Sequence, residues 1–289
     1  MAKLIRVDAE LVRRKLARSR AEASELIRAG HVYLDKNLVT KPARQMDPAQ
    51  ALVVDMKKAD NWASRGAHKL LGALDYLGEN GPEIAGVRAL DAGASTGGFT
   101  DVLLRRGAGH VVAVDVGYGQ LAWRLREDSR VTVLERTNVR TLQPEMVAPA
   151  PSLVVGDLSF ISLTLLIPAL VACSSNNAEF LLMVKPQFEV GKAKIGAHGV
   201  VTNTEYHVEA VCDVALCAAR NGLNVYAVAP SPLPGPAGNV EYFLYMTKYV
   251  KETLPILPAG SELSTVSEDF MHAVREAVDN GPAGKEKSE

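Results

Sequence analysis

The sequence has few cysteines and no long apolar run. Three of its 289 residues are cysteine, at positions 173, 212 and 217, and their spacing is not that of a metal-binding or disulfide framework. An odd number of cysteines within apolar helical patterns is typical of a reducing compartment. The longest apolar stretch, residues 162–173, contains Pro168, and it is shorter than the ~20 residues of a membrane-spanning helix. Residues 1–20 are charged throughout and lack the apolar core of a signal peptide. We therefore expect a cytoplasmic protein without stable membrane association.

Two further motif classes are missing. No group of His, Cys, Asp and Glu has the spacing of metal ligands, so we expect no metal. No Gly-Lys-Ser or Gly-Lys-Thr follows the glycine-rich segment, which excludes a P-loop for nucleoside triphosphates.

Charge is unevenly distributed along the chain. The net charge is −1, but residues 1–60 hold 13 Lys and Arg against 8 Asp and Glu, so this part is basic and the remainder is acidic. A basic N-terminal part followed by an acidic remainder indicates that the N-terminal part binds a polyanion.

Residues 1–60 have the pattern of a small α+β unit. The segment from Asp8, an expected N-cap, has helical periodicity, and Ser19 with Glu22 forms a capping box before a second helix that stops at Gly30. Short strands are expected within the later segments, which are 31–35, 38–40 and 51–55. The helices carry many arginines. For one arginine a solvated surface is the simpler interpretation, but the cluster favours RNA binding.

Residues 6–46 resemble the RNA-binding module of the ribosomal-protein-S-four type. The family pattern is a basic helical hairpin followed by x-G-x-V-x-(V/L)-(D/N)-G, and the chain has AGHVYLDK at positions 29–36. Lys36 stands where the family often has glycine, which concerns the turn alone. The residues that we expect to contact RNA are Arg6, Arg18, Arg20, Lys41 and, beyond this module, Arg65.

After residue 60 the chain alternates between apolar strands and amphipathic helices, which predicts a parallel sheet covered on both faces. The expected helices cover residues 65–77, 97–107, 119–128, 162–173, 205–220 and 267–278. The last two strands, near 224–231 and 241–249, are separated by too few residues for a crossover helix, so they should pair antiparallel. This is the class I methyltransferase variant of the Rossmann fold. The expected parts are 1–60 for RNA binding, 61–82 as linker and first helix, 83–250 as methyltransferase domain, and 251–289 as C-terminal helix and tail.

The stretch RALDAGASTGGFTDVL at 88–103 places a glycine-rich turn between a strand and a helix, which favours a ligand with an anionic or nucleoside part. The turn does not satisfy G-x-G-x-x-G. Residues 93–97 match the Gly-x-Ser-x-Gly elbow of a hydrolase with Ser95 as nucleophile. That elbow normally comes late in a sheet, and neither His198 nor His207 is marked as its base.

Asp115 indicates an adenosine ligand. It ends the second strand, 24 positions after Asp91, where an acid can bind both ribose hydroxyls. Both NAD and S-adenosylmethionine need such an acid. Asp91 favours the sulfonium cofactor, because its carboxylate can lie near a cationic amino-acid group, and Asn138 is placed to meet the adenine ring.

Four polar residues stand at the ends of elements that should converge above this ligand: Lys69, Asp157, Lys185 and Glu241. Each alone has an ordinary surface interpretation. Together they resemble the Lys-Asp-Lys-Glu tetrad of ribose 2′-O-methyltransferases of the FtsJ type.

A wider resemblance covers roughly residues 1–250. The motifs SRGAHKL, LDAGASTGGFTD, VDVGYGQL, NVR, GDLSFISL, VKPQFEVGK and NVEY, behind the RNA-binding module, are similar to those of the hemolysin A/TlyA family. The resemblance implies S-adenosylmethionine-dependent 2′-O-methylation of cytidines in ribosomal RNA, within 30S or 50S subunits, and a link to susceptibility to cyclic-peptide antibiotics. It assigns the tetrad as catalytic. The residues that it and the turn assign to the cofactor are Asp91, Gly93, Ala94, Ser95, Gly97, Phe99, Asp115, Val116, Asn138 and Val139.

This chemistry needs a base, because a ribose 2′-hydroxyl is a very weak acid. A lysine has a reference pKa of about 10.4, which a second lysine and partial burial would lower. We expect Lys185 to be the base, Lys69 the neighbour that lowers its pKa, and Asp157 with Glu241 the groups that hold both amines. Placement of oxygen, methyl carbon and sulfur in line supplies most of the rate.

Other functions remain as alternatives. Amino-methylating enzymes carry Asn/Asp-Pro-Pro-aromatic where this chain has DLSF at 157–160, and cytosine-C5 enzymes need a strand-end cysteine, whereas Cys212 and Cys217 lie within a helical pattern. A nicotinamide dehydrogenase on the same fold, a membrane-active hemolysin-like protein and an inactive RNA-binding scaffold are further alternatives.

Overall fold

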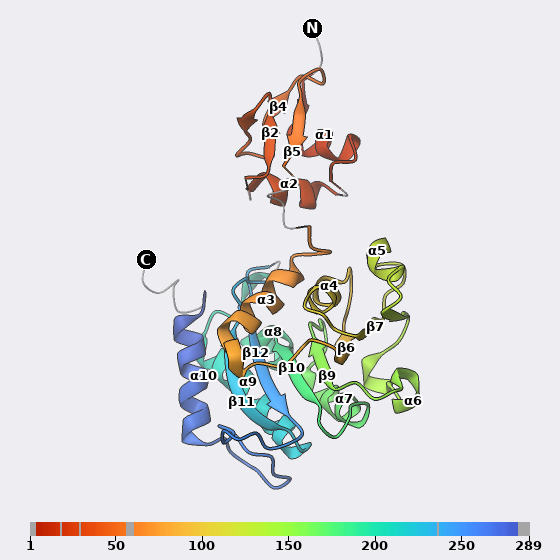
Figure 1. The fold of residues 1–289 in the computed structure, drawn as a ribbon. Helices are drawn as coiled ribbons and strands as arrows, with labels where there is room; N and C mark the ends of the chain where they lie inside the picture. The colour runs from red at the N-terminus through yellow and green to blue at the C-terminus, as the bar shows by residue number, and fades with distance from the viewer. Residues whose placement is uncertain (1–3, 18, 29, 56–60, 236, 283–289) are drawn as a thin grey trace. The chain divides into compact units, whose positions relative to one another are not determined.

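The chain forms two compact units, residues 1–61 and 62–289 (Figure 1). The computed structural model describes residues 4–17, 19–28, 30–55, 61–235 and 237–282. Each unit has a hydrophobic core of its own.

The first unit is an α+β module. Its elements are β1 (Ile5–Arg6), α1 (Val7–Arg13), α2 (Arg20–Arg28), β2 (Val32–Leu34), β3 (Asn37–Leu38), β4 (Gln45–Met46) and β5 (Leu52–Val54). Strand β2 pairs antiparallel with both β3 and β5, and β1 pairs antiparallel with β4. The apolar faces of the two helices and the small sheets enclose one core that includes Leu11, Ile27 and Val32.

Two carboxylates inside this module bind four of its arginines. Asp8 was expected to cap α1, but the helix begins at Val7, and Asp8 is a buried first-turn residue whose carboxylate accepts hydrogen bonds from Arg6 and Arg20. Glu10, also buried, binds Arg13 and Arg14. The hydrogen bonds from Arg6 and Arg13 hold the pKa of Asp8 and of Glu10 at about 2. Part of the basic cluster is therefore neutralised within the fold.

The second unit is built on a seven-stranded sheet in the order β11-β12-β10-β9-β6-β7-β8. The strands are β6 (Arg88–Ala92), β7 (His110–Val114), β8 (Val131–Leu134), β9 (Leu153–Gly156), β10 (Glu179–Val184), β11 (Asn224–Pro230) and β12 (Tyr242–Thr247). Strands β6 to β10 run parallel, whereas β12 runs antiparallel to both β10 and β11. The predicted parallel sheet with an antiparallel terminal hairpin is confirmed.

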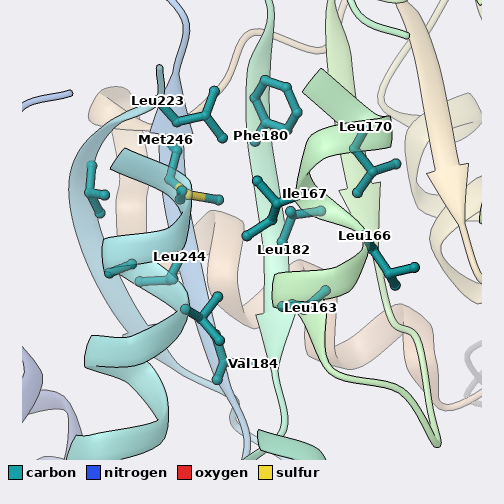
Figure 2. Packing of buried hydrophobic residues seen from close by; sticks show 14 of the residues in the cluster. Leu163, Leu166, Ile167, Leu170, Phe180, Leu182, Val184, Leu223, Leu244 and Met246 are labelled. Atoms are coloured by element: carbon teal, nitrogen blue, oxygen red, sulfur yellow. The ribbon is translucent and has the colours of Figure 1, made fainter. Parts of the chain in front are cut away.

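Helices cover both faces of this sheet. They are α3 (Gly66–Leu77), α4 (Gly98–Arg105), α5 (Trp123–Arg126), α6 (Pro144–Val147), α7 (Ile167–Ala172), α8 (Pro186–Glu189), α9 (Thr204–Arg220) and α10 (Glu268–Asn280). Side chains of β10 alternate between the two resulting core clusters, which explains why the strand is apolar almost throughout. Figure 2 shows one cluster, with side chains from η3 (Leu163–Leu165), α7, β10 and β12, among them Leu163, Ile167, Phe180, Leu182, Leu244 and Met246.

Two predicted helices are shorter than expected. Residues 119–128 form only the single turn α5, because the segment before it is a turn in which Gly119 has φ +70°. Residues 162–173 form η3 and then α7, since Pro168 has no N–H to continue a helix through this point and instead lies in the first turn of α7. Within the described ranges, no helix is long and apolar enough to cross a membrane.

We predict that Glu10 stabilises the first unit above pH 4.5 and loses this effect on acidification. The pKa of Glu10 is about 2 in the folded state, against a usual 4.5. Between these pH values the unfolded chain binds a proton that the folded chain does not, so the stability falls as the pH falls. At pH 7, Glu10→Gln should speed amide hydrogen exchange in residues 7–13 by about tenfold, and the difference from the unsubstituted protein should shrink toward pH 2. Glu22→Gln, in the first turn of α2, is the matched control. A difference that does not depend on pH would contradict this role of the Glu10 charge.

Candidate active site

The four residues of the predicted tetrad converge because of the strand order. Asp157 directly follows β9 and Lys185 directly follows β10, so both stand at the carboxyl edge of the parallel strands. Glu241 directly precedes β12, whose antiparallel direction brings its first residue beside Val184, the last residue of β10. Lys69 reaches the same point from the first half of α3. Ligand sites in open α/β sheets lie at this edge.

These side chains form a ring of alternating charge. Lys69 Nζ lies 2.5 Å from Glu241 Oε2 and 3.8 Å from Asp157 Oδ2. Lys185 Nζ lies 2.5 Å from Asp157 Oδ1 and 4.0 Å from Glu241 Oε1. Each ammonium therefore faces both carboxylates. The four groups lie together, as expected, and we refer to them as the charged ring.

The ring is almost withdrawn from solvent. Glu241, Lys185 and Lys69 are 1%, 6% and 8% exposed, and the Asp157 side chain is 19% exposed. Burying four charges costs free energy unless they are paired, and here the pairing is mutual. Asp157 is the most accessible member of the ring.

The loop after Asp157 adds two groups, Ser159 and Phe160, that the sequence analysis did not assign. Ser159 Oγ accepts a hydrogen bond of 2.8 Å from Lys185 Nζ. Phe160 is 91% exposed, has φ +66°, and its ring centroid lies 5.2 Å from that of Phe188. The DLSF segment carried the signal, since it places a large aromatic residue in the loop that follows β9. An exposed aromatic ring of this kind can stack on a planar group.

The glycine-rich turn between β6 and α4 leaves no room for side chains. Gly93 has φ +83°, and a Cβ there would lie 3.1 Å from the carbonyl oxygen of Asp157. Gly97 has φ +96°, and a Cβ there would lie 2.3 Å from a methyl group of Leu125. Both positions need glycine, so the turn can bring its backbone close to a ligand.

Asp115, one residue after β7, faces this turn. Its carboxylate accepts hydrogen bonds from the backbone N–H groups of Ser95, at 2.8 Å, and Gly117, at 2.7 Å. It lines a small cavity together with Ala94, Gln120 and Glu135. An acid at the end of the second strand, beside a glycine turn, is placed to bind the hydroxyls of a ribose.

Asp91 is an unusual buried carboxyl at the end of β6. It is 0% exposed, its Oδ2 accepts a hydrogen bond of 2.7 Å from Thr100, and its Oδ1 has no partner among the described residues. Burial raises the pKa of Asp91 to about 7. A buried acceptor without a partner is able to receive a hydrogen bond from a bound ligand.

Other residues predicted for cofactor binding differ in their placement. The Phe99 side chain is buried and stacks on Phe243 with 6.0 Å between ring centroids, so only its backbone can face a ligand. Val139 is also buried, whereas Val116 is exposed. Asn138 is exposed, and its Oδ1 accepts a hydrogen bond from the N–H of Arg140, which leaves the amide NH₂ to meet a ring.

The hydrolase alternative has no support in this geometry. Ser95 Oγ donates a hydrogen bond of 3.5 Å to Gln120 Oε1. His207 is buried and bonds through its two ring nitrogens to Tyr242 Oη and to the Val201 carbonyl, at 2.9 and 2.8 Å. It therefore has no nitrogen left to serve as a base for Ser95.

The residues predicted to contact RNA lie on the surface where they are described. Arg6 and Arg20 keep 43% and 59% of their side chains exposed although both bind Asp8. Lys41 is exposed in the first unit, and Arg65 is exposed at the start of α3 in the second. Arg18 lies outside the described residues.

Within the described residues no group of three or more His, Cys, Asp and Glu could hold a metal ion.

Comparison with known proteins agrees with this geometry. The FtsJ-like methyltransferase model matches residues 62–248, and the S4 domain model matches residues 5–50. The chain is 51% identical over 98% of its length to the whole of the 16S/23S rRNA (cytidine-2′-O)-methyltransferase TlyA of Mycobacterium tuberculosis. It is 33% identical to hemolysin A of Brachyspira hyodysenteriae, over 78% of this chain and 93% of that protein.

A solved structure shares the architecture of both units. A hemolysin candidate from Streptococcus thermophilus, 32% identical, matches the whole of both chains with a TM-score of 0.71. The chain therefore belongs to the FtsJ-like methyltransferase family and, with an S4 domain ahead of the methyltransferase domain, to the TlyA and hemolysin A group within it.

Proposed function

We propose that this protein methylates the 2′-hydroxyl of a ribose in ribosomal RNA, with S-adenosylmethionine as the methyl donor. The observation that carries the proposal is the charged ring, in which two lysines and two carboxylates meet at the carboxyl edge of the sheet. The name of the M. tuberculosis relative states cytidine-2′-O-methylation of 16S and 23S rRNA, and at 51% identity we extend this substrate class to the present chain.

The residues around the glycine turn fit this cofactor. The orphaned Oδ1 of Asp91 is a suitable acceptor for the cofactor's amino group, and the carboxylate of Asp115 for its ribose hydroxyls. Gly93 and Gly97 let the turn approach the ligand, and Asn138 can meet the adenine ring. When bound, the cofactor supplies a methyl group on a positively charged sulfur, which is already a strong electrophile.

The chain's own contribution is to prepare the attacking hydroxyl. Lys185 Nζ is held by Asp157 and by Ser159, which leaves its remaining direction for the 2′-hydroxyl, whose proton it accepts. Lys69, fixed on Glu241, keeps a positive charge near the developing alkoxide. The rigid ring and the strand ends then set the hydroxyl in line with the methyl group.

Phe160 supplies a platform for the base of the target nucleotide. A ribose within folded RNA becomes accessible when its base leaves the stack, and exposed aromatic side chains hold such bases by stacking. Phe160 is 91% exposed and follows Asp157 by three positions, so a base stacked on it has its ribose close to the charged ring.

The first unit supplies affinity for the ribosomal substrate. We assign residues 1–60 to RNA binding, 61–82 to the linker and first helix, 83–250 to methyl transfer and 251–289 to a C-terminal helix and tail. Exposed cations such as Lys41 and Arg20 contact phosphates, an interaction that does not depend on the base sequence. A ribosomal substrate also assigns the protein to the cytoplasm.

The proposal is tested by transfer of a tritiated methyl group to purified 30S and 50S particles, followed by alkaline hydrolysis. A 2′-O-methyl group protects the adjacent phosphodiester, so labelled dinucleotides resistant to alkali are expected. Label found only in mononucleotides would mean base methylation and would overturn the proposal.

We predict that Lys185→Ala lowers kcat for methyl transfer by at least about 100-fold, because general-base catalysis contributes 10²–10⁴-fold. Binding of S-adenosylhomocysteine, measured by titration calorimetry, should stay within about threefold. Lys192→Ala, an exposed lysine seven residues later, is the control. Turnover retained in the Lys185 variant would remove this residue as the base.

Replacing Phe160 by Ala should lower kcat/KM for the RNA substrate by about 10-fold, because stacking on one aromatic residue is worth about 1–3 kcal/mol. Phe160→Trp should retain most of the activity, since it keeps a planar ring. The measurement is single-turnover methylation at several RNA concentrations. Equal loss in the Ala and Trp variants would show that the ring does not act as a stacking surface.

For the first unit, we predict that Arg20→Gln with Lys41→Gln weakens RNA binding and flattens its dependence on salt. Each lost phosphate contact should reduce the slope of log K against log salt by about 1. The slope is measured by fluorescence anisotropy between 50 and 200 mM salt. Arg28→Gln, which removes an exposed charge on the same helix, should leave it unchanged. A double variant with the original slope would make Arg20 and Lys41 bystanders.

A further inference from the structure

Glu189 joins the two segments that follow the catalytic strand ends. It is the last residue of α8, the short helix after Lys185. Its Oε2 accepts a hydrogen bond of 2.5 Å from Ser162 Oγ, and its Oε1 accepts one of 2.9 Å from the N–H of Leu163. Both bonds reach the far end of the loop that begins at Asp157. The carboxylate thus ties the segment after β9 to the segment after β10.

Partial burial of the Glu189 carboxylate costs free energy. Glu189 is half-buried, burial raises its pKa, and no lysine, arginine or histidine of the described residues forms an ion pair with it. A partly buried carboxylate without a cation needs hydrogen bonds to compensate, and among the described residues Glu189 receives them from the Ser162–Leu163 end of the loop. The arrangement therefore exists only while the loop is docked.

The tied loop carries groups that act on the charged ring. Ser159 Oγ accepts a hydrogen bond from Lys185 Nζ, and Phe160 is held at φ +66° with its ring against Phe188 of α8. A non-glycine residue in this conformation persists only where its surroundings fix it. Without the hydrogen bonds that Glu189 accepts, the loop between Asp157 and Leu163 would still be anchored at β9 and η3. It would lose the contact that fixes its conformation.

We propose that Glu189 is a positioning residue for methyl transfer, which holds the Asp157–Leu163 loop so that Ser159 keeps Lys185 Nζ directed at the substrate. This inference rests on the function proposed above and names a residue outside the tetrad. Glu189 does not touch the reacting atoms, and it acts through Ser162, Leu163 and Ser159.

A purely structural role would give a different result. Ser162 already caps η3, since its Oγ accepts a hydrogen bond of 3.1 Å from the N–H of Thr164 and lies 2.7 Å from Thr164 Oγ1. If Glu189 only strengthened this cap, its loss would lower the melting temperature and leave kcat unchanged. A positioning role lowers kcat while KM for RNA and the affinity for S-adenosylhomocysteine stay nearly constant.

The experiment compares Glu189→Ala, Glu189→Gln and Ser159→Ala in the full chain. We expect Glu189→Ala to lower kcat by at least about 10-fold and Glu189→Gln by less than about threefold, because the amide can still accept from Leu163 and bond to Ser162. Ser159→Ala should resemble Glu189→Ala, and the double variant should lose no more than the larger single loss, as expected for residues acting through one contact. Asp213→Asn, a carboxyl of α9 close enough to affect Glu189, is the control.

Unchanged kcat in Glu189→Ala, equal losses in Ala and Gln, or additive losses in the double variant would overturn the proposal. Ser162→Ala, which removes one hydroxyl, replaces Glu189→Ala if that variant does not fold.

A second measurement separates this proposal from the function itself. Amide hydrogen exchange in residues 158–164 should rise in Glu189→Ala and not in Glu189→Gln, whatever reaction the protein catalyses. Suppose that exchange increases in Glu189→Ala but the unsubstituted protein does not methylate ribose. The proposed function would then be wrong, and the role of Glu189 in holding the loop would stand. Unchanged exchange in Glu189→Ala would remove the tie even if ribose methylation is found.

Discussion

The charged ring of Lys69, Asp157, Lys185 and Glu241 is the interaction on which the site depends. Four charges are withdrawn from water at one edge of the sheet, and each ammonium faces both carboxylates, while Lys185 also donates to Ser159. Removing one partner of such a group leaves an uncompensated buried charge, which is more costly than replacing all of them. The ring therefore requires its supporting elements, α3 and strands β9, β10 and β12, to hold their positions closely.

Strand direction makes this arrangement possible. In a wholly parallel sheet, the residue before β12 would lie at the opposite edge from Lys185. Because β12 runs antiparallel to β10, its first residue pairs with the last of β10, and Glu241 reaches the ring. The antiparallel hairpin that distinguishes methyltransferases from dinucleotide-binding Rossmann folds thus has a direct chemical consequence here. It brings a second carboxylate to the two lysines.

Sequence patterns predicted the elements that are buried on a regular face, and they failed where local turns or paired charges decide. The terminal hairpin followed from its short connection, and the convergence of the tetrad from strand ends and motifs. Asp8 had the spacing of a helix cap, but its pairing with Arg6 and Arg20 buries it one residue inside the helix. Ser159 and Glu189 were not predicted, because their roles depend on contacts between residues 26 and 27 positions apart. No local pattern records such contacts.

The composition of the ring matches the charge changes of the proposed reaction. Two ammonium groups and two carboxylates sum to zero, so a ring able to accept the 2′-hydroxyl proton on Lys185 carries one negative charge. S-adenosylmethionine, when bound, would bring a positively charged sulfur to this edge of the sheet, and that positive charge would be lost on methyl donation. At the same moment the ring gains a proton and becomes neutral. The charge that the ring loses on protonation therefore matches the charge that the sulfonium would lose, so the ring carries no net charge after transfer, which favours the step in a low-dielectric site.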